Sequence, residues 1–219
     1  MEKKFRILNI LMVIVCLTVL MIYREVGGTF MKGITSSCFA VLGVVNLIYA
    51  LCRREKLWFP GWMAGALITT AAADVVLQYN FLLGTAVFAL GHFGYLIGYC
   101  GLEKFTKRDL LPVLCIMAVT MLIVFILRVE DPVMSVMVLI YGVIISLMLG
   151  KAVGNLLAKR DILRLLICIG SVMFWFSDLM LAWNIFAGGG RLASELCLFT
   201  YWPGQTMLAH SMFYYGTKD

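Results

Sequence analysis

Charged side chains are scarce in this sequence of 219 residues: Asp, Glu, Lys and Arg make up 14%, whereas 63% of residues are hydrophobic. The mean hydropathy is +0.97, and soluble domains carry about a quarter of charged residues. The shortage of charge therefore excludes a soluble domain and predicts a polytopic membrane protein. The formal net charge of +6 does not indicate nucleic-acid binding, because the basic residues stand in short loops between apolar segments.

Patterns for metal ligation and for disulfides are also missing. The seven cysteines are irregularly spaced, form no C-x-x-C pair and lie almost entirely in apolar runs. Only two histidines are present, His92 and His210, and neither belongs to an H-x-x-H or H-E-x-x-H pattern. We therefore expect no disulfide framework, no metal site and no cofactor.

Long apolar segments dominate what remains, and each approaches the ~20 residues that a helix needs to cross a bilayer. They cover residues 5–23, 33–52, 57–77, 81–101, 110–127, 132–150, 162–186 and 192–214. The alternation of a membrane barrel is absent and no loop can hold a soluble domain, so we predict one all-α membrane domain over 1–219 with eight transmembrane helices. The first segment resembles a signal peptide, but no small-x-small cleavage site follows it, so we count it as a helix.

Basic residues in the loops predict the orientation, because Lys and Arg accumulate on the cytoplasmic side. Eight alternating segments place fourteen of them on one side and four, Arg24, Lys32, Arg128 and Arg191, on the other. The fourteen are Lys3, Lys4, Arg6, Arg53, Arg54, Lys56, Lys104, Lys107, Arg108, Lys151, Lys159, Arg160, Arg164 and Lys218. Both termini are thus expected in the cytoplasm, and a bacterial cytoplasmic membrane is the expected location.

One pattern occurs twice. Asp-x-x-Leu-x-x-Asn-x-x-x-Gly begins at Asp74 in the third segment and again at Asp178 in the seventh. Both segments run toward the outer face, and the copies lie nearly half a chain apart. The pattern favours two parallel four-helix repeats, about 1–105 and 106–219, related by an axis along the membrane normal.

The two aspartates are the leading candidates for chemistry, since ionisable groups inside a membrane segment are costly and commonly functional. If the halves are related by two-fold pseudosymmetry, Asp74 and Asp178 lie at equal depth and can face one cavity. Two carboxyl groups in a low dielectric do not both ionise readily, which is typical of an acid/base pair. The alternative is two separate structural carboxylates, each bonded to a neighbouring polar side chain.

Further polar residues share helix faces with these acids or follow them closely. His92 and Tyr95 are three residues apart, and Tyr201 and Gln205 are four apart beside Pro203, so each pair lies on one face. No G-x-S-x-G sequence surrounds the serine before Asp178, which disfavours a serine hydrolase. The residues expected to position substrate or water are His92, Tyr95, Ser177, Asn80, Asn184, Tyr201 and Gln205.

The order and spacing of these motifs resemble the YhhN family, which includes the animal TMEM86 lysoplasmalogenases. The matching positions are 73–77 with 81–84, then Gly91-His92 with Tyr95, then 176–179 with Leu181 and Asn184, and Tyr201 with Gln205. Ala73 stands where the family usually has glycine before the first aspartate, and Pro203-Gly204 precedes Gln205, so the local geometry of the eighth helix departs from the family pattern.

The resemblance implies an integral-membrane hydrolase that cleaves the vinyl-ether bond of lysoplasmalogens to a fatty aldehyde and a glycerophospho-alcohol. It implies Asp74 and Asp178 as the carboxylate pair and a single-chain membrane lipid as substrate. A related ether lipid or lactone-like compound is an alternative substrate in bacteria that lack plasmalogens. A small proton-coupled transporter and a non-catalytic lysolipid-binding protein fit the same acids, and product formation distinguishes them. The sequence does not assign the acid role to either aspartate, and it leaves the oligomeric state open.

Overall fold

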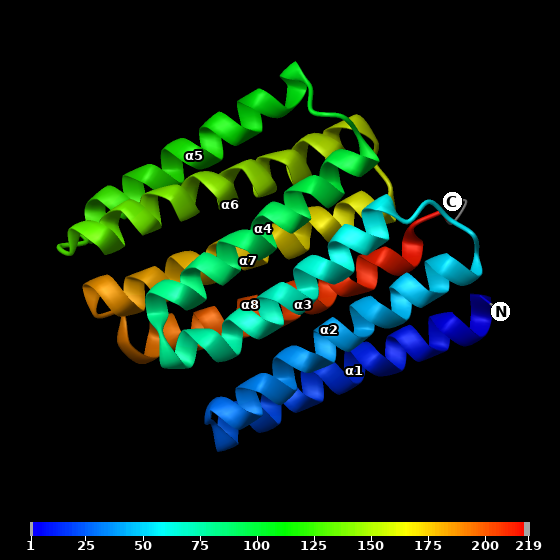
Figure 1. Cartoon of the computed structure of the whole chain (residues 1–219), viewed down its shortest axis with the longest axis horizontal. Coiled ribbons are helices and arrows are strands. Elements are labelled where there is room, and N and C mark those ends of the chain that lie inside the picture. The colour runs from blue at the N-terminus through cyan, green and yellow to red at the C-terminus, as the bar shows by residue number, and fades with distance from the viewer. Residues whose placement is uncertain (1, 217–219) are drawn as a thin grey trace.

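The computed structural model of the chain describes residues 2–216 and is all helical there (Figure 1). Its elements are α1 (Glu2–Val26), α2 (Thr29–Cys52), α3 (Trp58–Tyr79), α4 (Phe81–Leu102), α5 (Lys107–Leu127), α6 (Pro132–Ala158), α7 (Ile162–Ala187), α8 (Gly190–Ser211) and the 3-10 turn η1 (Met212–Tyr214). The prediction of an all-α polytopic membrane protein is confirmed.

Seven of these helices, α1 to α7, are long and apolar enough to cross a membrane. α8 has a similar length, but its interior carries buried polar side chains, among them Gln205 and Thr206, which lower its hydropathy. Helix α8 packs along α7 and also contacts α2, α1 and α3, so it belongs to the bundle as much as the others do. The lower hydropathy of α8 thus reflects a polar interior, which is where a site is expected.

Successive helices run antiparallel and are joined by short connections (Figure 1). Helix α1 begins and α8 ends at the same end of the bundle, as an even number of crossings requires. The connections 53–57, 103–106 and 159–161 also lie at this end, and they carry much of the basic charge that predicts a cytoplasmic face. Lys218, which was counted with that charge, lies outside the described residues.

The largest differences from the helix boundaries expected from hydropathy are in α2 and α6. Helix α2 begins at Thr29 rather than at residue 33, so Lys32 lies in its first turn. Helix α6 continues to Ala158 rather than ending at 150, so Lys151 lies inside it. Both lysines are buried and paired with carboxylates, and such pairing allows a helix to continue past a charge that a hydropathy scale treats as its end.

Glycines allow the tightest helix contacts. A Cβ atom at Gly84 of α4 would lie 2.5 Å from the Cα atom of Leu77 in α3, and one at Gly150 of α6 would lie 2.6 Å from the Cα atom of Val113 in α5. Small residues at such crossings let helix backbones approach within the membrane, where van der Waals packing drives association.

The two halves show corresponding contacts between elements. Helix α4 packs on α6, and α8, its counterpart in the second half, packs on α2. The repeated motif differs in its last residues: α3 ends at Tyr79 and Asn80 caps α4, whereas α7 continues to Ala187 and ends at Gly188 with a φ of 64°. The division into half-repeats at 1–105 and 106–219 stays a prediction.

Candidate active site

Polar side chains from six helices meet inside the bundle, on the side of its outer loops. Asp178 stands nine residues before the end of α7, which is about 13 Å from that end at 1.5 Å per residue. Asp74 stands five residues before the end of α3. Each aspartate is held by its own set of partners, one on α4 and α6 and the other on α2 and α8.

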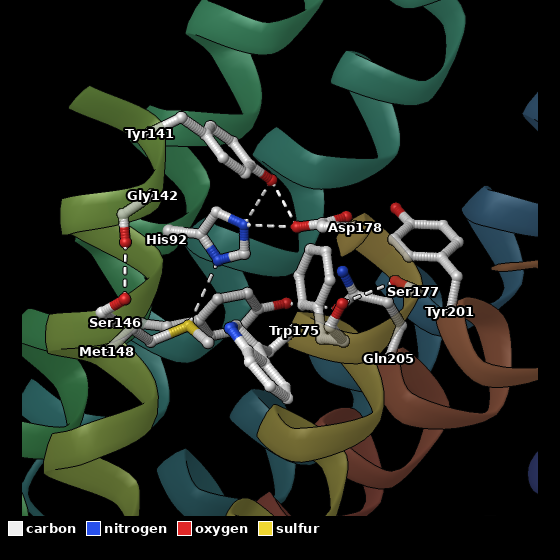
Figure 2. Close-up of polar contacts among 12 residues, drawn as sticks. His92, Tyr141, Gly142, Ser146, Met148, Trp175, Ser177, Asp178, Tyr201 and Gln205 are labelled. Carbon is white, nitrogen blue, oxygen red and sulfur yellow. Dashed lines mark hydrogen bonds and ion pairs between the residues drawn. The ribbon is translucent and has the colours of Figure 1, made fainter. Parts of the chain in front are cut away.

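Asp178 belongs to a triangle of side chains from three helices (Figure 2). The hydroxyl of Tyr141 in α6 donates to Asp178 Oδ2 at 2.5 Å. His92 Nε2 in α4 lies 2.7 Å from the Tyr141 hydroxyl and 3.3 Å from the same carboxylate oxygen. A proton held by any one of these three groups has a hydrogen-bonded route to the other two.

The imidazole of His92 is fully buried and fixed on its other side as well. Its Nδ1 atom lies 3.2 Å from the sulfur of Met148, and the ring packs on Phe174 with 4.4 Å between centroids. Contacts on both edges and on the face hold the imidazole in one orientation relative to Asp178. Such fixing is what proton transfer by a histidine requires.

Asp74 belongs to a second set of contacts, in which both carboxylate oxygens are engaged. Oδ2 accepts from Ser36 at 2.5 Å and from Tyr201 at 2.7 Å. Oδ1 faces Lys32, whose Nζ atom lies 3.6 Å away. Trp202 donates its indole N–H to the Ser36 oxygen at 3.3 Å, so the Ser36 proton is directed to the carboxylate.

Aromatic rings and one amide join the two sets. Tyr201 packs on Phe174, and Phe174 packs on His92, so a continuous row of rings runs between the aspartates. Figure 2 shows Asp178 between the His92–Tyr141 pair and the ring of Tyr201. Tyr95 in α4 donates to Oε1 of Gln205 in α8 at 2.6 Å, whereas Nε2 of this fully buried amide lacks a partner among the described residues.

A small apolar cavity of about 60 Å³ reaches Asp178. Its walls come from α3, α4, α6 and α7, and the carboxylate and the Tyr141 hydroxyl are its chief polar groups. The other lining residues are Leu77, Phe81, Thr85, Phe88, Val138, Leu181, Ala182 and Phe186. The arrangement places one carboxyl group, with 15% of its side chain exposed, at the wall of a hydrocarbon-lined space.

The structure brings together most of the residues expected at a site, namely Asp74, Asp178, His92, Tyr95, Tyr201 and Gln205. Three others lie elsewhere or are already engaged. The hydroxyl of Ser177, fully buried, donates to the backbone oxygen of Phe174 at 2.6 Å. Asn80 is exposed and caps α4 by accepting from the backbone N–H of Leu83, and Asn184 is half-buried near the end of α7.

Three functional candidates were not expected from the sequence: Lys32, Ser36 and Tyr141. Lys32 was counted as a charge of an outer loop, since the apolar segment was expected to begin one residue later. Ser36 and Tyr141 stand in apolar runs with no distinguishing neighbours. Lys32 and Ser36 are four residues apart, so they lie on one face of a helix, and this spacing could have indicated these two residues. No sequence signal indicates Tyr141.

The described part of the chain offers few ligands for a metal ion. No three His, Cys, Asp or Glu side chains of residues 2–216 lie close enough together to ligate one ion. The polar groups of the site are two carboxyl groups, an imidazole, an ammonium, hydroxyls and an amide. This set can donate protons, accept protons and stabilise a positive charge.

Fold and site together define a multi-pass helical membrane protein with two interior carboxyl groups that bond to histidine, tyrosine and serine side chains. The sequence profile of the YhhN family matches residues 29–212, and the chain belongs to this family. The chain is also similar to mouse (Mus musculus) lysoplasmalogenase TMEM86B, with 28% identity over 176 residues that cover 78% of this chain and 71% of the mouse protein. No solved structure matches the chain. The family match begins at the start of α2, so α1 lies outside it.

Proposed function

We propose that this protein hydrolyses the vinyl-ether bond of lysoplasmalogens or of closely related single-chain ether lipids, with Asp74 and Asp178 as its catalytic carboxyl groups. Family membership and the similarity to mouse lysoplasmalogenase TMEM86B support a hydrolase of this kind. The observation that carries the proposal is the position of Asp178, hydrogen-bonded to Tyr141 and His92 at the wall of an apolar cavity.

The chemistry of a vinyl ether suits these groups. A proton is delivered to the alkene carbon farther from the ether oxygen, and the alkene electron pair forms the new C–H bond. The resulting oxocarbenium ion is stabilised by a nearby carboxylate, as in glycoside hydrolysis. Water then adds to the cationic carbon and loses a proton, which gives a hemiacetal. The hemiacetal breaks its bond to the glycerol oxygen, so the products are an aldehyde and an alcohol.

The surroundings of the carboxyl groups fit each stage. The walls of the small cavity are mostly apolar, which suits the carbon atoms next to the reacting double bond, and a low dielectric strengthens the attraction between a carboxylate and a cation. The buried Nε2 atom of Gln205, which has no hydrogen-bond partner among residues 2–216, can donate to the attacking water or to a substrate oxygen. Neither step needs a nucleophilic serine, and the Ser177 hydroxyl is bonded to the backbone.

The direct test is aldehyde release by the purified full-length protein in mixed micelles. Three lysolipids with the same head group and chain length are compared: a 1-alkenyl, a 1-alkyl and a 1-acyl lipid. We expect aldehyde from the alkenyl lipid alone, since only this ether carries a carbon that can be protonated. Cleavage of the acyl lipid would reveal an esterase, and three unchanged lipids would favour a carrier or a binding protein.

Matched aspartate variants test the site in the same assay. Asp178→Asn and Asp74→Asn are each expected to lose aldehyde release. Asp131→Asn serves as the control, because Asp131 caps α6 at the outer surface and asparagine also caps helices. Wild-type turnover in both site variants would reject the carboxylate mechanism even if the substrate is right.

A further inference from the structure

Lys32 distinguishes the two aspartates of the site. It lies in the first turn of α2, is 9% exposed, and forms an ion pair with Asp74 at 3.6 Å. Ser36, one helical turn further on, donates to the other oxygen of the same carboxylate. A single face of α2 therefore supplies a partner to each oxygen of Asp74, and Tyr201 adds a third donor from α8.

Hydrogen-bond accounting indicates an ionised Asp74. An ionised carboxylate only accepts hydrogen bonds, whereas a protonated one must also donate. The Lys32 ammonium can only donate, and the indole N–H of Trp202 on the Ser36 oxygen directs the Ser36 proton toward the carboxylate. Lys32 thus places a permanent cation against one oxygen of Asp74, and hydroxyl groups bond the other oxygen, so these surroundings suit a negative charge.

Asp178 has a different environment. Its one ion-pair partner within residues 2–216 is His92, a side chain that is charged only when protonated. Its other partner is the neutral phenol of Tyr141, which can either donate to a carboxylate or accept from a carboxylic acid. Its remaining surroundings are the apolar cavity walls, which disfavour an isolated negative charge.

We propose that Lys32 is a positioning residue that holds Asp74 as the anion, so that Asp178 is the carboxyl group that carries the transferable proton. This assignment rests on the proposed function and adds the roles of the two acids to it. The network of His92 and Tyr141 then serves Asp178 alone, and the network of Lys32, Ser36 and Tyr201 serves Asp74.

The protons balance over one cycle under this assignment. Asp178 gives its proton to the alkene carbon and becomes a carboxylate, while the Asp74 anion stabilises the cation. Asp74 accepts a proton from water as the water oxygen bonds to the cationic carbon. When the hemiacetal breaks, its hydroxyl proton returns to Asp178 and the proton on Asp74 goes to the departing glycerol oxygen. Both acids are back in their starting states.

Infrared spectroscopy of the purified protein tests the assignment without any substrate. A protonated carboxyl group in a membrane interior gives a C=O stretching band that a carboxylate lacks. We expect the wild type to show this band at neutral pH, Asp178→Asn to lose it and Asp74→Asn to keep it. A band lost in Asp74→Asn but kept in Asp178→Asn, or no band in the wild type, would overturn the assignment.

Variants of Lys32 test its own part. Lys32→Met removes the charge but keeps the length of the side chain, so a second C=O band should appear, and Lys32→Met with Asp74→Asn should lack it. Turnover of Lys32→Met should fall more than tenfold, and Lys32→Arg should restore it to within about threefold because arginine is also a cation. A Lys32→Met spectrum without a new band contradicts the role given to Lys32.

The two levels of the proposal fail in different ways. A wild type that releases no aldehyde but shows the expected bands refutes the vinyl-ether reaction and leaves the two charge states standing. A wild type that releases aldehyde but shows the reversed bands refutes the division of roles and leaves the reaction standing.

Discussion

Two buried ion pairs at opposite ends of the bundle contain the same residue types and differ in their surroundings. At the end that is predicted to be cytoplasmic, Asp109 of α5 pairs with Lys151 of α6 at 3.1 Å, and both side chains are almost fully buried. At the outer side, Lys32 pairs with Asp74 next to Asp178. The first pair bonds to the backbone at the start of α5, whereas the second is linked through the rings of Tyr201 and Phe174 to His92, which contacts Asp178.

The cytoplasmic pair has a complete set of local partners. Asp109 also accepts from the backbone N–H of Thr106 at 2.6 Å, which caps α5, and Lys151 also donates to the backbone oxygen of Lys104 at 3.0 Å. These bonds cap the start of α5 and join it, with the connection before it, to α6. We infer that Asp109 and Lys151 stabilise the fold, and that burial of a carboxylate alone does not identify a site.

The two clusters differ in the kind of space beside them. Asp178 faces an apolar cavity between helices, whereas Asp109 and Lys151 line a hollow that also carries the charged side chains of Glu103, Lys104 and Arg108. In the outer cluster, Nε2 of Gln205 also has no hydrogen-bond partner among the described residues. The comparison teaches that an acid with an apolar space in front of it and spare hydrogen-bonding groups beside it is the candidate for chemistry. We expect substitutions in the outer cluster to lower activity and substitutions at Asp109 and Lys151 to lower stability.

The largest expected effect is on turnover at the outer cluster. Asp178→Asn keeps the shape of the side chain but removes the transferable proton, so turnover should fall by about 10²–10⁴-fold, the usual contribution of a general acid. The thermal unfolding midpoint should change little. Asp109→Asn is the matched comparison and should retain turnover per folded molecule, and the reverse pattern would show that the pair of Asp109 and Lys151 carries the reaction.

The next effect is on stability at the cytoplasmic pair. Lys151→Met leaves the Asp109 carboxylate buried without its cation, which in soluble proteins costs about 3–5 kcal/mol. Unfolding of the detergent-solubilised protein measures the change. The double variant Lys151→Met with Asp109→Asn removes both charges and keeps the helix cap, so it should recover part of the loss. Equal stability of the single and double variants would argue against a coupled pair.

A smaller effect on stability is expected at a glycine crossing. Gly150→Ala adds a Cβ atom 2.6 Å from the Val113 Cα atom, and overpacking of this kind costs about 1–3 kcal/mol. Gly65→Ala in α3 is the control, because a Cβ atom there meets nothing within 4 Å. The two variants should differ clearly in unfolding midpoint, and identical midpoints would mean that α5 and α6 do not pack this closely.

The smallest effect concerns the phenol beside Asp178. Tyr141→Phe removes the hydroxyl that bonds both Asp178 and His92 and leaves the ring in place. Turnover should fall by roughly tenfold, about 1.4 kcal/mol of transition-state stabilisation. The KM should change little, because the hydroxyl contributes to proton transfer more than to binding. A raised KM with unchanged kcat would make Tyr141 a substrate-binding residue instead.

Hydropathy and the position of acids predicted a large share of this molecule. The eight helices were predicted from the lengths of the apolar segments. Asp74, Asp178, His92 and Tyr201 stand out because polar groups inside a membrane are energetically costly and are commonly functional. Such groups are visible in a sequence even when their partners are not.

The partners were missed for physical reasons. Hydropathy ends a segment at the first charge, so Lys32 and Lys151 were assigned to loops although carboxylates from other helices hold them inside. Tyr141 is one aromatic residue in an apolar run, and only the crossing of α4, α6 and α7 places its hydroxyl between His92 and Asp178. Contacts between distant helices depend on packing, which local sequence does not encode.

The position of the new hydrogen atom tests the central claim most directly. Hydrolysis of a 1-alkenyl lysolipid in D₂O, followed by mass spectrometry of the aldehyde, reports where the proton is delivered. If the enzyme protonates the alkene carbon, the aldehyde gains one deuterium on the carbon next to its carbonyl group, and Asp178→Asn does not produce it. An aldehyde with no deuterium at that carbon would contradict acid catalysis at this site.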